Sequence, residues 1–268
     1  MVVYVCSMHV EGTIYQSQSK YLKARDIFIQ TRPDIALERN YAYAALNIAQ
    51  IDIEIGEVGG PGVELNIATA QKYFSEVQSQ AELYSCQAVL ASLQLKKHNW
   101  IQAKAMFEEC LQVSWSQGPG LTFYALEKLA DITLWQSVDF PCASRRSVIY
   151  LVLSVRHKSK LNFHKSLRCL GDVLLSENDH ESAEALFQVA LEGFTTMDVH
   201  RSRAECMARM GELAIRAGRM DQAEKLWQKA CILFERSSQT TQAAEIQRKL
   251  ADLAARNKDT VLMSQGVL

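Results

Sequence analysis

The chain has 268 residues and a formal net charge of −1, with 29 Lys and Arg against 30 Asp and Glu. This balance gives no global attraction toward nucleic acid or membrane surfaces, and no apolar run reaches the roughly 18 residues that a membrane-spanning helix needs. The seven cysteines are scattered singly, with no Cys-x-x-Cys pair, which indicates reduced thiols in a cytoplasmic protein and disfavours a zinc site.

Helix pairs with one small residue in the first helix recur along the chain. The steps between these small residues are similar, at roughly 40 positions each. A fixed period of about 20–50 residues is typical of solenoids, which mostly present surfaces to partners and rarely perform chemistry. The small residues of the six copies are Gly12, Ala49, Ala91, Ala130, Gly171 and Gly211, and the aliphatic residues two places later are Ile14, Ile51, Leu93, Ile132, Val173 and Leu213.

The first three copies follow the pattern with one interruption. The first places Phe28 in its second helix, and the third places Phe107 there, each four residues after an alanine. The second carries a Gly-rich insertion from Gly56 to Gly62, which we predict to be a loop before a second helix that contains Phe74.

The last three copies range from the weakest match to the best. In the fourth, the segment after Pro141 fits the second-helix pattern only loosely, with Ala143 as its small residue. A further helix of the first type over 241–256 is predicted to end the array, and 258–268 to be a frayed tail. The fifth and sixth copies agree at four positions with one common offset: Gly171 and Gly211, Ala183 and Ala223, Phe187 and Trp227, Ala190 and Ala230.

A repeated glycine inside a helix needs a packing reason, because it costs about 1 kcal/mol relative to alanine. We predict that it lets the backbone of a second helix approach closely, with the aromatic residue filling the gap beside the alanines. The Leu-Gly … Ala-x-x-x-Phe-x-x-Ala signature resembles the tetratricopeptide repeat, whose period is about 34. The longer period here suits armadillo and HEAT repeats, but the signature favours tetratricopeptide units with longer helices or loops. The resemblance implies an all-α fold, a right-handed α-solenoid of about six helix-turn-helix repeats over 1–257.

Motifs for catalysis and cofactor binding are absent from the sequence. There is no phosphate-binding loop, no dinucleotide fingerprint, no His-Glu-x-x-His and no Gly-x-Ser-x-Gly. The stretch Gly59 to Gly62 lacks the Lys and Ser or Thr of a phosphate cradle, and His157 and His164 have no acidic or Cys ligand between them. We therefore predict that the chain is not an enzyme, uses no cofactor or metal, and serves as a scaffold that binds a protein or peptide.

One segment departs from the even charge balance. No Asp or Glu occurs from Phe140 to Gly171. Either the segment docks an acidic peptide or a phosphate-bearing ligand, or it is a solvated junction whose Arg and Lys stems cover apolar surface. Tyr150 and Phe163 are the only aromatic residues well inside the segment, too few for a base-stacking platform, which disfavours nucleic acid as a partner. The basic residues of this patch are Arg145, Arg146, Arg156, Lys158 and Lys160.

In tetratricopeptide arrays the first helices line the concave face, and ligands usually bind there. Trp135 either serves as a hot spot on this groove or packs against the loop before Pro141. Acidic residues stand where the family's carboxylate clamp has Asn, which disfavours an adaptor for chaperone tails. By resemblance, the candidate partner-binding residues are Tyr124, Glu127, Asp131, Trp135, Lys165, Arg168, Asp172, Glu205, Glu212 and Arg216.

The stretch from Lys165 to Ala255 is similar to the C-terminal repeats of fungal STAND signalling ATPases, in which a NACHT or NB-ARC module precedes a long repeat array. In that family the repeats are the sensor half. The chain opens on VVYVC, inside what should be a first helix, so we expect a fragment. The resemblance implies an alternative in which the partner is the protein's own N-terminal ATPase domain. Cargo adaptors and ubiquitin-ligase scaffold subunits also have repeats of this length.

Overall fold

The computed structural model describes residues 2–31, 38–114, 119–135 and 140–264, and all regular structure in these ranges is α-helical. Helices alternate along the chain between two roles, which we call first and second helices. The first helices are α1 (Val2–Ser17), α3 (Glu38–Ile55), α5 (Gln80–Lys96), α7 (Pro119–Trp135), α9 (Lys160–Ser176), α11 (His200–Arg216) and α13 (Thr240–Ser264). The second helices are α2 (Tyr21–Thr31), α4 (Pro61–Glu76), α6 (Trp100–Ser114), α8 (Phe140–Arg156), α10 (His180–Thr196) and α12 (Met220–Arg236).

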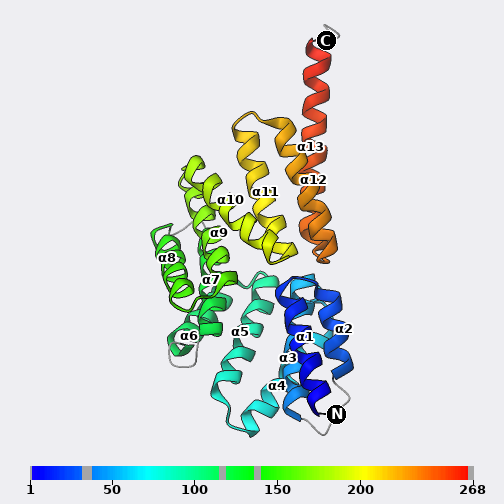
Figure 1. Cartoon of the computed structure of the whole chain (residues 1–268), viewed down its shortest axis with the longest axis vertical. Coiled ribbons are helices and arrows are strands. Elements are labelled where there is room, and N and C mark those ends of the chain that lie inside the picture. Colours follow the sequence, from blue (N-terminus) through cyan, green and yellow to red (C-terminus); the bar gives the residue numbers. More distant parts are fainter. Residues whose placement is uncertain (1, 32–37, 115–118, 136–139, 265–268) are drawn as a thin grey trace.

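The helix pairs stack one after another into a solenoid (Figure 1). Each second helix packs between its own first helix and the next one, and neighbouring first helices such as α7 and α9 also touch. Over the described ranges the fold is therefore the predicted all-α solenoid, with six helix pairs followed by a further first helix. That last helix, α13, continues to Ser264, beyond residue 256, where the sequence pattern ends it.

The long period of the repeat follows from the length of its helices together with the three-residue turns that join them. Between α9 and α10, Asn178 has a φ of 64°, and the Asp179 N–H donates to the carbonyl oxygen of Leu174 at 2.9 Å. This geometry is a Schellman motif, and the Asp179 side chain also caps α10 by accepting from the Ser182 N–H at 3.2 Å. Helices α9 to α12 have 17 residues each. Two such helices and two such turns account for the full spacing between Gly171 and Gly211. The turns are equally regular. Residues with a left-handed backbone conformation recur every 20 positions, at Lys158, Asn178, Asp198, Gly218 and Ser238.

Packing against aromatic rings explains why the first helices of three repeats carry a glycine. A Cβ built on Gly171 would lie 2.8 Å from Cε1 of Phe187, and one on Gly12 would lie 2.9 Å from the Phe28 ring. The prediction that glycine admits the backbone of a second helix is therefore wrong in detail. What approaches is the ring of the aromatic residue, which occupies the space into which a Cβ would project.

Two copies reach the same packing by other means. In the second copy, the predicted loop ends before Gly62, because Pro61 starts α4. Proline suits the first position of a helix, where a backbone N–H has no partner within the helix. In the fourth, Ser147 stands where the aromatic residue is expected and Tyr150 stands one turn later, and both are buried. The Tyr150 hydroxyl donates to Oδ1 of Asn162 at 2.9 Å, so the shifted ring keeps its polar atom paired.

The solenoid curves until its N-terminal helices meet its C-terminal ones. In Figure 1 the blue N-terminal helices lie below α11 and α12. The His200 N–H donates to the carbonyl oxygen of Gln18 at 3.1 Å, and Lys20 pairs with Asp198 at 2.8 Å. Nε2 of Gln239 also donates to the carbonyl oxygen of Glu54 at 2.6 Å. These closure contacts join repeats one and two to repeats five and six.

Candidate functional site: the charged concave face

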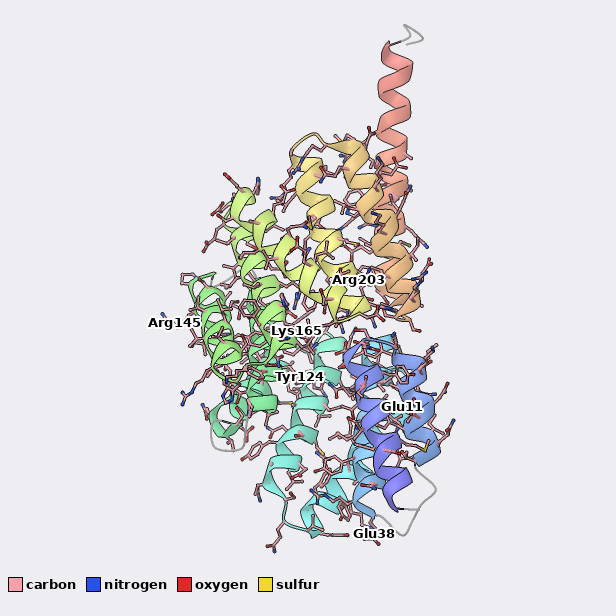
Figure 2. The ribbon with its side chains drawn as sticks, in the orientation of Figure 1. Glu11, Glu38, Tyr124, Arg145, Lys165 and Arg203 are labelled. Atoms are coloured by element: carbon pink, nitrogen blue, oxygen red, sulfur yellow. The ribbon has the colours of Figure 1, made fainter. Side chains whose placement is uncertain are left out.

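The first helices place their polar side chains on the inner, concave side of the solenoid. Figure 2 shows Tyr124 of α7 and Lys165 of α9 near the middle of the molecule. The Tyr124 hydroxyl lies 2.6 Å from Oγ of Ser92, and Nζ of Lys165 lies 2.9 Å from Oε2 of Glu127. The candidate side chains of α7, α9 and α11 are thus brought together, and most are paired with one another.

An acid–base ladder runs between successive first helices. In the last three copies, the small residue is followed by an acidic residue that pairs with a cation 37 positions later, on the next first helix. Asp131 lies 3.6 Å from Arg168, and Asp172 lies 2.8 Å from Arg209. The last rung joins Glu212 to Lys249 at 2.6 Å. The acids at the clamp positions therefore each already face a cation of the next first helix.

Arg168 is the centre of this network. Its side chain is 8% exposed, and its guanidinium faces carboxylates from three helices. The distances are 3.3 Å to Glu127, 3.6 Å to Asp131, 3.1 Å to Asp172 and 3.5 Å to Glu205. One positive charge is thus shared among four acids, so each receives only part of its compensation.

Because the compensation is unequal, the neighbouring acids Glu127 and Asp131 have very different pKa values. Burial alone would raise the pKa of Glu127, but Lys165 and Arg168 outweigh burial and hold it at about 2. For Asp131, burial dominates the pull of Arg168 and raises the pKa to about 6. Two carboxylates one helical turn apart therefore hold protons with very different affinity.

Replacing Asp131 with Asn is expected to stabilise the protein at alkaline pH. Because the folded pKa lies above the unfolded value near 3.9, folding favours the protonated acid, and stability falls as pH rises from about 4 to about 6. We expect Asp131→Asn to raise the free energy of unfolding by about 1–3 kcal/mol at pH 8 and to change it little at pH 4. Urea denaturation at both pH values measures this, with Asp26→Asn on the exposed side of α2 as the control. A loss at pH 8 would show that Arg168 compensates Asp131 fully.

Several residues that the sequence interpretation missed complete the network. Glu54 of α3 pairs with Lys128 at 3.3 Å and also with Arg201. Burial would raise the pKa of Glu54, but Arg201 and Lys128 outweigh it and hold the pKa well below its ordinary value. Arg201 also pairs with Glu205 at 2.8 Å. Glu54 thus connects the central network to the closure contacts.

An open cavity lies at the C-terminal end of this face, between α11, α12 and α13. Its volume is about 320 Å³, within the range of small-ligand sites. The floor includes the indole of Trp227, fixed by a 3.1 Å hydrogen bond from Nε1 to the carbonyl oxygen of Ala208. Arg216 is exposed at the cavity and lies 3.0 Å from Nε2 of His180. The lining residues are Glu212, Ile215, Arg216, Trp227, Lys249, Asp252, Leu253 and Arg256.

The basic patch does not lie on the concave face. Arg145, Arg156, Lys158 and Lys160 are exposed on α8, on the turn that follows it and at the start of α9. Arg146 instead belongs to the packed structure, since it pairs with Glu108 at 2.7 Å and donates to Thr133 at 2.8 Å. Trp135 is the last residue of α7, and its side chain lies outside the part of the chain that the structure describes.

Neither a metal-binding cluster nor a membrane-spanning helix occurs in the described residues. No group of three or more His, Cys, Asp or Glu side chains within them is arranged to hold a metal ion. No helix in the same ranges has both the length and the apolar character needed to cross a membrane.

Comparison with known proteins supports the solenoid. The model of one family, SNAP or soluble NSF attachment protein, matches residues 156–262, which is less than half of the chain. No curated protein sequence matches at a significant level.

Solved structures of helical-repeat proteins superpose over most of the chain. A Rap protein in complex with competence and sporulation factor has a TM-score of 0.64 at 11% identity, over 94% of this chain and 75% of Rap. The apo form of RapI has a TM-score of 0.56 at 13% identity, over 96% of this chain and 99% of RapI. A STAND protein with a tetratricopeptide repeat sensor from Pyrococcus horikoshii has a TM-score of 0.56 at 14% identity, over 92% of this chain and 40% of that protein. At these identities the likeness shows the fold: the chain is a helical-repeat solenoid similar to tetratricopeptide proteins.

Proposed function

We propose that residues 1–257 form one non-enzymatic interaction scaffold that binds a peptide or protein segment on its concave face. The observation that supports this most is the cavity between α11 and α13. Apolar side chains (Ile215, Leu253 and Trp227) line it beside charged ones of both signs. An apolar anchor surrounded by polar groups is the usual composition of a peptide hot spot.

The predicted binding residues then divide into two groups. Arg168, Asp172 and their partners hold successive repeats together, so a ligand reaching them would have to replace existing ion pairs. Glu212 and Arg216 line the cavity, Glu212 while paired with Lys249, and we expect both to contact the ligand. We expect the segment to bury one apolar side chain in the cavity, with charged neighbours against Arg216 and Asp252.

A displayed library of random peptides tests this function. Peptides selected on the wild-type chain should lose at least about tenfold in affinity for Arg216→Glu, because a hot-spot charge is reversed. Arg248→Glu makes the same substitution at an exposed position of α13 outside the cavity and should leave affinity unchanged. If both variants bind the peptides equally well, the cavity is not the peptide-binding site.

A second candidate is the regulatory half of a STAND-type ATPase, in which the ligand is the nucleotide-binding module of the same protein. The similarity to the STAND protein with a repeat sensor favours it, and this chain spans 40% of that protein. It predicts that a separately supplied nucleotide-binding domain binds the chain, and that Arg216→Glu weakens this binding.

A further inference from the structure

The outer side of α8 exposes an apolar stripe that the solenoid does not use. Val148, Val152 and Val155 are 45%, 60% and 59% exposed. Their spacing of four and three residues places them along one face of the helix, over a length of about 10 Å. Three aligned valines in water cost hydrophobic free energy, so their alignment calls for a partner surface.

The repeat itself does not require these valines. With the alanines Ala143, Ala183 and Ala223 aligned, the same exposed positions can be compared in three second helices. Helix α10 has Gln188, Glu192 and Thr195 there, and α12 has Gln228, Ile232 and Glu235. The uninterrupted apolar stripe is therefore a property of α8.

Unpaired positive charge surrounds the stripe. Arg145 lies before it, while Arg156, Lys158 and Lys160 cluster at its C-terminal end. All four are exposed, and none forms an ion pair with another residue in the described ranges. The nearby carboxylate of Glu108 is already paired with Arg146. The segment from Phe140 to Gly171 contains no acid that could neutralise them.

We infer that this outer face of α8 docks an amphipathic helix of another protein, whose apolar stripe is flanked by Asp and Glu. Apolar residues at i, i+4 and i+7 are the spacing by which helices engage apolar partner surfaces. The four unpaired cations select acidic flanks and repel basic ones. An anionic membrane is disfavoured, because helices that lie in lipid carry Trp, Phe or Leu on their apolar face, whereas this stripe consists of valines.

The surface is separate from the concave site. Figure 2 shows Arg145 at the outer edge of the molecule, whereas Lys165 lies near its centre. The two sites therefore allow the scaffold to hold two partners at once, and each can be disabled without the other.

The test is a displayed library of amphipathic helices with Leu fixed on the stripe and random residues on both flanks. Selection on the wild-type chain should enrich Asp and Glu on the flanks. The selected helices should lose at least about tenfold in affinity for Val152→Glu. Val189→Glu introduces the same charge at an exposed valine of α10 and should change affinity less than about twofold. Binding to Arg216→Glu should be unchanged, which separates this site from the cavity.

Three results would overturn the inference. The first is selection without acidic enrichment, and the second is equal binding to Val152→Glu and Val189→Glu, with both variants folded by circular dichroism. The third is co-sedimentation of the wild-type chain with phosphatidylserine vesicles that is lost in Val152→Glu, which would assign the stripe to a membrane surface.

Discussion

Replacing Arg168 with Leu is expected to lower the free energy of unfolding by about 3–5 kcal/mol, because it leaves buried acids without their shared counter-charge. The guanidinium is 8% exposed and faces Glu127, Asp131, Asp172 and Glu205. Urea denaturation of the whole chain at pH 8 measures the loss. An apolar side chain of similar bulk fills most of the volume, so the effect reports mainly charge and not a cavity.

A surface ion pair provides the matched control. Arg219 pairs with Glu184 at 2.8 Å, and its side chain is 40% exposed. Arg219→Leu should lower the free energy of unfolding far less than Arg168→Leu does, since water screens the pair. Equal losses for the two variants would mean that Arg168 contributes no more than a surface charge.

The loss at Arg168 should also depend on pH in a stated direction. Without Arg168 the pKa values of the four acids rise, so the folded variant binds more protons than the folded wild-type protein at intermediate pH. The variant therefore recovers stability relative to wild type as pH falls from 8 toward 4.5. A difference that stays constant over this range would contradict the charge network.

The helix pairs can be predicted from the sequence because their cause is local and repeated. A small residue in one helix and an aromatic residue about 16 positions later, such as Gly171 and Phe187, belong to adjoining helices that must pack together. What the spacing does not reveal is which atoms meet. That depends on the rotamer of the ring and on the distance between the helices, and here the ring takes the space that the prediction gave to the backbone.

The concave face can be predicted in part. The register places Asp131, Asp172 and Glu212 at equivalent positions, but their pairing was missed because the cations stand elsewhere in the repeat. Arg168 lies three residues before its glycine, and Arg209 lies two residues before the next one. An acid followed by a cation 37 positions later, repeated three times, is a signal that the sequence does contain.

Contacts between distant repeats cannot be predicted from the repeat pattern. The pairing of Glu54 with Arg201 joins residues 147 positions apart. The repeat pattern predicts contacts only between neighbouring units. The closure arises from a small rotation per repeat, which accumulates until the N-terminal helices meet α11.

Gly211 is a position where an added side chain should destabilise the protein strongly. A Cβ built there would collide with Nε1 of Trp227 and lie 2.6 Å from its Cδ1. The indole cannot yield freely, because its Nε1 donates to the carbonyl oxygen of Ala208 at 3.1 Å. We expect Gly211→Leu to cost about 3 kcal/mol or more, at or above the upper end of overpacking losses. Gly211→Ala should also destabilise, although alanine favours a helix by about 1 kcal/mol.

Two comparisons decide whether the indole is the cause. Gly62 of α4 has nothing within 4 Å of its ideal Cβ, so Gly62→Ala should leave stability unchanged or raise it by up to about 1 kcal/mol. In a Trp227→Ala background, Gly211→Ala should change sign and become stabilising, because only the helix propensity remains. Denaturation midpoints of the four variants in this double-mutant cycle measure the coupling. If Gly211→Ala costs the same with and without the indole, the glycine is required by something other than Trp227, and the same doubt would extend to Gly171 and Phe187.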